Sequence, residues 1–226
     1  MKTCKSPGRL QLVLLCVGMS LVALPARAVD YGVSAGVGTL GAGLGVTFGV
    51  TERLNTRIGF GYFSEDDLDF EESGVTYVGE VTVGGVYGLL DFHPTGGGFR
   101  VSGGLVLNNN ELTGESTVTS NIPIGGGFYT VDRLSATANF DDVAPYIGIG
   151  WGNAARSKPG WGFSFDLGVM IQGDVNVALQ AEGGDANDPA FQDDLRREEE
   201  ALANELEEYI NIDVFPVVAL GAGYTF

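Results

Sequence analysis

The sequence predicts an all-β fold, an eight-stranded antiparallel transmembrane β-barrel with one amphipathic helix between the last two strands. Three observations predict it. Long stretches alternate between large apolar and small or polar side chains, glycine supplies 36 of the 226 residues, and an alternating stretch runs to the aromatic residue Phe226. Alternation with an apolar outward face and a polar inward face, interrupted by turns, is typical of barrels that cross a membrane with strands.

The segment 1–28 is expected to be a cleaved export signal. It has a basic start, an apolar run over 10–24 and small residues at 26–28, which is the pattern that a signal peptidase reads. The apolar run is shorter than the about 20 residues that a membrane-spanning helix needs. Four of the 12 Lys and Arg leave with this segment, so the mature chain, 29–226, has 8 basic and 29 acidic residues and a formal net charge of −21.

Composition limits what the mature chain can do. Its strong negative charge disfavours nucleic acid as a partner, because phosphate binding needs clustered Lys and Arg. Both cysteines, Cys4 and Cys16, lie in the signal segment, so disulfide and thiol chemistry are excluded from the exported protein. The length fits one domain, which we expect to be a barrel over 29–226.

The clearest alternation lies in "GWGFSFDLGVMIQG", residues 160–173. One set of positions holds only large apolar side chains: Trp161, Phe163, Phe165, Leu167, Val169 and Ile171. The other set is glycine, polar or methionine. The same pattern recurs in 42–51, 57–62 and 99–108. A period of two over so many residues predicts long strands with one uninterrupted apolar face.

The small and polar face of these strands decides between a soluble and a membrane fold. A soluble β-sandwich turns its large apolar side chains inward and carries Lys, Glu and Thr, rather than glycine, on the outside. Here the second face is rich in glycine and contains a few charged residues: Arg57, Glu80, Arg100 and Asp166. That composition suits a crowded lumen, and the bulky face suits lipid. A chain without helical spans crosses a bilayer only as a closed barrel.

Turn residues separate eight candidate strands. The predicted strands are 30–39, 41–51, 54–63, 76–91, 98–112, 128–151, 160–176 and 213–226. Bacterial single-chain barrels have an even number of strands. Only "TLG" separates the first two, so 30–51 can also be read as one long bent strand. The stretch 128–151 is long enough to be bent or to extend beyond the membrane.

The connections orient the chain. With both termini in the periplasm, one set of connections is short, and the other is mostly long and acidic. The short set is 51–54, 92–97 and 152–159, and the long set is 64–75, 113–127 and 177–212. Short periplasmic turns and longer outer loops are what bacterial outer-membrane barrels show.

The segment 189–209 breaks the strand pattern and is predicted to be a helix on the outer side, between the last two strands. Asp188 before Pro189 is a favourable helix start. Apolar residues from Phe191 to Leu206 recur at helical spacing, and the opposite face is acidic. The apolar stripe either caps the barrel mouth or neighbouring loops, or serves as a docking face for a partner or for the lipid surface.

The C-terminal stretch resembles the assembly signal of bacterial outer-membrane barrels. Tyr224 and Phe226 share one face of the last strand, and Gly223 and Thr225 share the other. The chain as a whole is similar to the small OmpA- and OmpX-type eight-stranded barrels, and a resemblance to OmpW-type barrels is also possible without a local motif that selects it. The resemblance implies that Tyr224 and Phe226 are read by the barrel-assembly machinery.

The inward charges predict a polar cluster in the lumen. Arg57, Glu80 and Arg100 are placed on consecutive strands, and Asp166 is placed on a strand that can reach them across a small barrel. We expect salt bridges among them to plug the lumen, because eight-stranded barrels are usually filled by side chains. The alternative is a narrow passage lined by the same charges, serving as a pore or lateral conduit for small or apolar solutes.

Nothing in the sequence predicts an enzyme or a cofactor. The only histidine, His93, lies in a predicted periplasmic turn, away from outer-surface substrates, and no nucleophile and base stand in a recognisable arrangement. Asp66, Asp67 and Asp69 offer oxygen ligands for loose cation binding, without the order of an EF-hand. The expected function is structural or interactive, in a monomer held by outer-membrane lipid and lipopolysaccharide, with acidic loops presented outside the cell.

Overall fold

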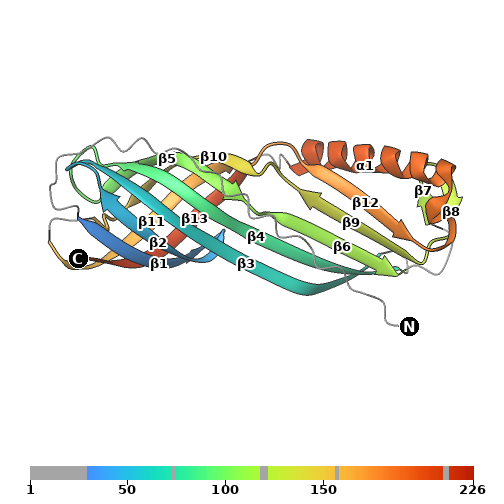
Figure 1. Cartoon of the computed structure of the whole chain (residues 1–226), viewed down its shortest axis with the longest axis horizontal. Coiled ribbons are helices and arrows are strands. Elements are labelled where there is room, and N and C mark those ends of the chain that lie inside the picture. The colour runs from blue at the N-terminus through green and yellow to red at the C-terminus, as the bar shows by residue number, and fades with distance from the viewer. Residues whose placement is uncertain (1–29, 73–74, 118–121, 156–157, 211–213) are drawn as a thin grey trace, which may run out of the picture.

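The computed structural model describes residues 30–72, 75–117, 122–155, 158–210 and 214–226. Within these ranges the chain forms 13 β-strands, one short 3-10 helix and one α-helix (Figure 1). The predicted all-β class is therefore confirmed. The expected signal segment, 1–28, lies outside the described residues.

Eight of the strands form a closed antiparallel ring. Around the ring they are β1 (Tyr31–Gly38), β2 (Gly41–Gly49), β3 (Leu54–Glu72), β4 (Val75–Phe92), β5 (Phe99–Asn108), β10 (Val143–Trp151), β11 (Gly160–Ile171) and β13 (Val214–Thr225). The ring closes where β13 pairs with β1, so that Val33 lies opposite Tyr224. The region 30–51 is two strands, β1 and β2, and the alternative of one long bent strand is wrong.

The prediction that the whole chain has only eight strands is wrong. Three further strands leave the ring and extend its wall: β6 (Glu111–Thr117), β9 (Arg133–Asn139) and β12 (Asn176–Glu182). A separate hairpin is formed by β7 (Ile122–Ile124) and β8 (Gly127–Tyr129). The region 64–75, predicted to be a loop, is instead the far end of the β3–β4 hairpin, with 73–74 outside the described residues.

The added strands continue strands of the ring in the same register. Gly85 of β4 pairs with Asn108 of β5, and Thr82 of β4 pairs with Glu111 of β6, so β5 and β6 follow one line with an interruption at 109–110. We call the closed eight-stranded part the ring. The extension comprises β6, β9, β12, α1, the β7–β8 hairpin, and the parts of β3 and β4 beyond Tyr62 and Gly84 (Figure 1).

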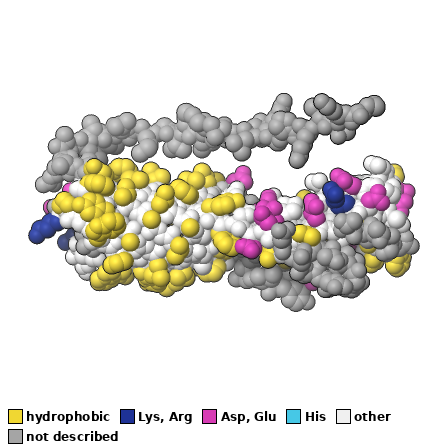
Figure 2. Space-filling model, turned by 90° about the horizontal axis from the view of Figure 1, so that it is seen from below, with side chains coloured by type: hydrophobic (Ala, Val, Ile, Leu, Met, Phe, Trp, Pro, Cys, Tyr) yellow, Lys and Arg dark blue, Asp and Glu magenta, His cyan; other side chains and the backbone are white. Residues whose placement is uncertain are grey.

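The polarity of the strands inverts between the ring and the extension. In β10 the outward positions hold large apolar groups such as Ile147 and Ile149, which are 60% and 48% exposed. In β9, which continues the same line, the outward positions are Arg133, Ser135, Thr137 and Asn139, and the inward ones are Leu134, Ala136 and Ala138. Figure 2 shows hydrophobic side chains over the ring and acidic ones over the extension.

The extension has its own hydrophobic core, which α1 (Pro189–Ile210) covers. Ile124, Val131, Leu179, Ala186, Phe191 and Leu195 are buried together. The Asp188 carboxylate accepts a hydrogen bond from the Ala190 amide at 2.7 Å and so caps the start of α1, after the 3-10 helix η1 (Gly184–Asn187). The apolar stripe of α1 thus packs on β12 and on the β7–β8 hairpin.

Helix α1 also covers one edge of the extended sheet. β12 is the last strand on that side of the sheet. The Glu199 carboxylate accepts a hydrogen bond from the Leu179 amide of β12 at 2.7 Å, and the Glu198 carboxylate ties α1 to the β7–β8 turn by accepting one from the Gly125 amide at 3.2 Å. Covering an edge strand prevents unwanted pairing with other chains. Within the described ranges, no helix is both long and apolar enough to cross a membrane.

Aromatic side chains gather at the end of the ring that carries the short turns and the C-terminal residue. Tyr31 stacks on Phe226 with ring centroids 5.0 Å apart, and Trp161 lies edge-on to Tyr224 at 5.5 Å. The Phe226 amide donates to the Tyr31 carbonyl at 3.0 Å. The two residues predicted to form the assembly signal, Tyr224 and Phe226, therefore belong to an aromatic cluster on the outer surface at this end.

Candidate functional site in the barrel lumen

Four strands of the ring direct charged side chains to one level of the lumen. Alternation places Arg57 of β3, Asp91 of β4, Arg100 of β5 and Asp166 of β11 on inward positions. Asp91 and Arg100 stand close together because a short turn joins β4 to β5, whereas Asp166 approaches from across the ring. We call these four residues the quartet.

Every carboxylate oxygen of the quartet accepts a hydrogen bond. The Arg57 guanidinium donates to both oxygens of Asp91, at 3.0 and 3.2 Å, and to both oxygens of Asp166, each at 3.1 Å. Arg100 Nη2 donates to the two oxygens of Asp166 at 2.7 Å. The Ser102 hydroxyl adds a bond of 2.5 Å to Asp91 Oδ1. Paired bonds from planar guanidinium groups fix both distance and orientation.

The quartet is buried and carries no net charge. The exposed fractions of its side chains are 13% for Arg57, 4% for Asp91, 5% for Arg100 and 9% for Asp166. Its two positive and two negative groups compensate one another. Removing ions from water is costly unless partners with good geometry surround them. The arrangement therefore forms a unit in which each member depends on the others.

The structure brings together three of the four residues predicted for the lumen, Arg57, Arg100 and Asp166, and leaves out Glu80. The inward positions of β4 are odd-numbered, as Leu89 and Asp91 show, so Glu80 is outward; it lies in the extension and is exposed. Sequence reasoning missed Asp91. Asp91 shares the odd-numbered positions of β4 with Tyr87 and Leu89, and this spacing indicates the same face of the strand. However, Asp91 is close to the strand end, where a charge is easily assigned to the following turn.

A second polar layer closes the lumen beside the short turns. The buried His93 ring lies between Asn55, whose amide nitrogen is 3.2 Å from His93 Nε2, and the Gly97 carbonyl, which is 3.0 Å from His93 Nδ1. The Asn55 amide also donates to the Asn153 side chain at 3.0 Å. These contacts fit a neutral ring that carries its proton on Nδ1. Burial lowers the pKa of His93, which favours the same neutral form.

The other half of the lumen is apolar. Leu89, Val106, Ala144, Tyr146, Met170 and Val217 form a buried cluster, with Leu40, Tyr87 and Phe215 packed against it. Leu40 comes from the β1–β2 turn, where the Thr39 hydroxyl donates to the Pro216 carbonyl at 2.9 Å and holds the turn against β13. The turn thereby contributes a side chain to the cluster that fills the lumen.

Buried amide groups mark the boundary between the ring and the extension. Asn110, in the interruption between β5 and β6, donates to Gln172 Oε1 at 2.8 Å. The side-chain oxygen of Asn110, Oδ1, accepts a hydrogen bond from the Gly84 amide at 2.9 Å. Gln172 and Asn110 are 2% and 6% exposed. Direct side-chain bonds here take over the role of the interrupted ladder hydrogen bonds.

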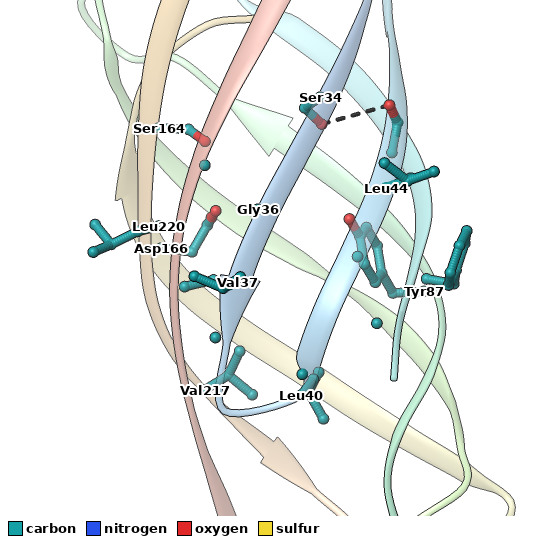
Figure 3. A pocket seen from close by; sticks show the side chains of 18 of the residues that line it. Ser34, Gly36, Val37, Leu40, Leu44, Tyr87, Ser164, Asp166, Val217 and Leu220 are labelled. Carbon is teal, nitrogen blue, oxygen red and sulfur yellow. Dashed lines mark hydrogen bonds between the residues drawn. The ribbon is translucent and has the colours of Figure 1, made fainter. Parts of the chain in front are cut away.

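A partly open hollow of about 110 Å³ borders these layers (Figure 3). On one side are glycine-rich strands β1, β2 and β13, and on the other are Arg57, Tyr87, Tyr146 and Asp166. Outward side chains such as Leu44 and Leu220 also line it, so the hollow reaches both faces of the glycine-rich wall.

The acidic residues predicted to bind cations lie on β3 instead of in a loop. Asp66 is exposed and sits at a register shift between Glu65 and Leu68, where β3 has one extra residue opposite β4. Asp67 and Asp69 belong to the same strand. Among the residues whose side chains are described, no three His, Cys, Asp or Glu are grouped to hold a metal ion.

The chain is similar in structure to bacterial outer-membrane barrels. CarO from Acinetobacter baumannii matches with a TM-score of 0.52 and 21% identity, over 86% of this chain and 97% of CarO. CarO2 from the same organism matches with a TM-score of 0.52 and 21% identity, over 88% of this chain and all of CarO2. A major outer membrane protein from Thermus thermophilus is more distant, with a TM-score of 0.40, 17% identity, and coverage of 88% and 100%.

These likenesses concern the fold. The sequence matches no protein-family model and no curated protein. The A. baumannii neighbours are outer-membrane β-barrels, and the likeness confirms the predicted β-barrel fold. No finding selects the OmpA-, OmpX- or OmpW-type within that class.

Proposed function

We propose that the protein is a non-enzymatic outer-membrane barrel with a closed lumen, which holds the extension in place outside the cell. The observation that carries this proposal is the quartet. It spans the lumen from β3, β4, β5 and β11, and its four side chains bind one another instead of lining an open channel. Eight-stranded rings are narrow enough for side chains to fill them.

Two further layers support a closed lumen. His93 and Asn55 form a buried network beside the short turns, and the cluster around Met170 and Val106 fills the opposite half. A hydrated ion would have to displace both layers and separate the ion pairs. We expect the passage of ions through this lumen to be negligible.

The orientation follows from the sizes of the two ends. Short turns and the aromatic cluster around Phe226 belong to one end, and the extension belongs to the other. Outer-membrane barrels have short periplasmic turns and longer outer segments. Both termini of the mature chain are then periplasmic, and the extension presents its acidic surface outside.

The same orientation defines the partners. The apolar outer face of the ring contacts outer-membrane lipid, and the extension lies next to lipopolysaccharide. The assembly machinery would read Tyr224 and Phe226 during insertion. We infer a monomer without nucleic-acid partners. The absence of a catalytic centre is supported by His93, whose ring is buried and held by Asn55 and Gly97.

Single-channel recording of the refolded mature protein in a planar bilayer tests the closed lumen. A heat-dependent shift in gel mobility confirms folding beforehand. We expect no discrete openings from the wild type. Asp166→Asn, which leaves two guanidinium groups with one carboxylate, should produce openings or unstable current, whereas Asp174→Asn at an exposed site should stay silent. Regular openings of the wild type would contradict the proposal and would favour a narrow pore.

One observation favours a second function, a lateral conduit for small apolar solutes. The hollow beside the quartet is lined by lumen-facing groups and also by Leu44 and Leu220, which are 56% and 60% exposed on the outer face. An apolar solute could then leave sideways into lipid without any ionic current. Uptake of an apolar fluorescent dye by cells, compared with the filling variant Ala219→Leu, tests this function; equal uptake would exclude it.

A further inference from the structure

The two edges of the sheet in the extension differ in what covers them. On one side α1 packs on β12, and on the opposite side lies β3 (Figure 1). β2 pairs with β3 only as far as Ala42 opposite Tyr62. From 63 to 72, β3 pairs with β4 alone. We call the side of 63–72 that faces away from β4 the free edge.

The backbone groups of the free edge are available for pairing. A strand at the edge of a sheet presents a row of unpaired N–H and C=O groups, which is a template for one more strand. Among the residues that the structure describes, none outside β4 forms a hydrogen bond with the backbone of 63–72. On β12, by contrast, the Glu199 carboxylate accepts the Leu179 amide. Addition of an extended peptide to an open sheet edge is a recurrent mode of peptide recognition.

The charge around the free edge limits which strand can pair there. Six of the ten residues in 63–72, "FSEDDLDFEE", are acidic, and no Lys or Arg occurs between Arg57 and Arg100. Glu80 of β4 adds an exposed carboxylate on the outer face. The basic residues described in the extension lie on β9 and α1, and each forms a salt bridge with an acidic neighbour: Arg133, Arg196 and Arg197. A basic strand would meet complementary charge, whereas a second copy of β3 would meet like charge.

The other face next to the free edge is apolar. Leu68 lies opposite Gly79. Gly79 in turn lies opposite Gly114, which lies opposite Ala136. Directly opposite residues share a face, and Ala136 packs against the core under α1. Leu68 is therefore on the core face but is 40% exposed, because α1 packs at the far side of the sheet. Apolar side chains of an added strand would lie beside Leu68.

We propose that the free edge of β3 binds an extended cationic peptide segment of another molecule as one further strand of the sheet. Basic and apolar residues alternate in this segment. Its backbone bonds to 63–72, its basic side chains lie on the acidic outer face, and its apolar side chains lie beside Leu68. The proposal rests on the proposed function only in that the extension is outside the cell. Binding to the purified protein depends neither on that orientation nor on a closed lumen, so the two proposals can fail separately.

A short peptide in which Lys and Val alternate, about eight residues long to match a strand, is the probe. Two comparison peptides separate charge from strand pairing. A Glu–Val peptide reverses the charge, and a Lys–Val peptide methylated on every backbone nitrogen keeps the charge but has no N–H groups to donate. Binding of each fluorescent peptide to the mature protein in non-ionic detergent is followed by anisotropy, at about 0.15 M salt to screen distant charges.

Two double variants test the charge at the free edge. Glu65→Gln combined with Asp66→Asn neutralises two exposed residues of β3. Glu200→Gln combined with Glu205→Gln makes the same change in net charge at exposed positions of α1 and is the matched control. Loss of two exposed charges next to the peptide should weaken binding about two- to tenfold.

Two cysteine variants locate the peptide. Ser64→Cys places a thiol on β3 beside the free edge, and Gln180→Cys places one on β12, at the opposite side of the sheet. The mature chain has no other cysteine. A Lys–Val peptide that ends in Cys can therefore form a disulfide only at the introduced position, and the yield at the two positions shows where the peptide lies.

We expect saturable binding of the Lys–Val peptide, weakened in the β3 double variant and unchanged in the α1 double variant, with a disulfide at position 64 and none at 180. The methylated and Glu–Val peptides should not bind. Equal binding of the methylated peptide would mean attraction to an acidic surface only and would overturn the proposal. The same holds if the Lys–Val peptide fails to bind, if both double variants weaken binding equally, or if position 180 reacts as well as 64. Disulfide-linked dimers of Ser64→Cys without peptide would identify a second copy as the occupant and would also overturn it.

Discussion

The ring and the extension are built from strands that continue one another but place their apolar side chains on opposite faces. In the line formed by β9 and β10, Ile147 and Ile149 point outward in the ring, whereas Ser135 and Thr137 point outward in the extension. The inward face changes as well, from glycine and Tyr146 to Leu134 and Ala136. The line of strands thus keeps its pairing register across the break at 140–142 while its polarity reverses.

The difference teaches what surrounds each region. A soluble sheet packs its apolar face against a core, and a membrane barrel turns that face toward lipid. The extension follows the first rule, with α1 covering its apolar face. The ring follows the second, with the quartet and glycine inside. Under the proposed function, the change at 140–142 marks the boundary between lipid and water.

The largest expected effect is the loss of one quartet member. Asp166→Asn should lower the free energy of unfolding by about 3–5 kcal/mol, because two buried guanidinium groups would then share one carboxylate. Urea unfolding in lipid vesicles, read from heat-dependent gel mobility, measures it. The exposed Asp174→Asn is the matched control.

Removing a complete ion pair sharpens this result. Arg100→Gln combined with Asp166→Asn leaves the lumen neutral and keeps the Arg57–Asp91 pair. It should be more stable than Asp166→Asn alone, since a missing pair costs less than a stranded charge. A double variant less stable than the single one would contradict the account of the quartet as a balanced unit.

The core of the extension should respond separately from the ring. Leu195→Ala removes a side chain that is 4% exposed and should lower the local stability of the extension by about 2–5 kcal/mol. Hydrogen exchange should then speed up in β9 and β12 and stay unchanged in β1 and β2. The exposed Glu200→Ala on α1 serves as control. Equal acceleration in the ring would show that the two regions unfold as one.

A charge on the outer face distinguishes the surroundings of the two regions. Ile147→Arg in the ring should cost about 2–4 kcal/mol if the residue lies near the bilayer midplane, whereas Gln180→Arg on the outer face of β12 should change the stability little. Unfolding in vesicles, by the same gel assay, compares them. A similar loss of unfolding free energy at both sites would contradict the conclusion that lipid surrounds the ring and water surrounds the extension.

The smallest expected effect is a pH dependence at His93. Its folded-state pKa lies below the ordinary value of about 6.5 because burial disfavours the charged ring. The neutral ring therefore contributes stability above that value, and the contribution is lost as pH falls from about 6.5 toward the folded-state pKa. Unfolding of the wild type and of His93→Gln at pH 7.5 and about 5 should differ in pH dependence in this direction.

The ring could be predicted from the sequence because lipid requires a continuous bulky face, which stretches such as 161–171 show directly. The extension could not, since its strands reverse that pattern and its region 64–75 has the composition of an acidic loop. The apolar side chains alternate on the outward face in the ring and on the inward face in the extension, so a single rule of alternation does not identify both regions.

The quartet was predictable only in part. Arg57, Arg100 and Asp166 stand out as charges among glycine and apolar residues. The prediction that Glu80 faces the lumen is wrong because even-numbered residues of β4 face outward. Asp91 was not predicted because it lies close to the end of β4. The hollow beside the quartet needs knowledge of how closely strands approach one another at Gly36 and Gly43, and no sequence period contains that information.

Cysteine labelling along the single line of β9 and β10 tests the lipid–water boundary most directly. The mature chain has no cysteine, so Ser135→Cys, Asn139→Cys, Ile147→Cys and Ile149→Cys can be made one at a time. A membrane-impermeant maleimide applied to intact cells should label 135 and 139 and should leave 147 and 149 unlabelled until the protein is unfolded in detergent. Labelling at 147 in intact cells, or labelling of 135 and 139 only after the outer membrane is disrupted, would contradict the account.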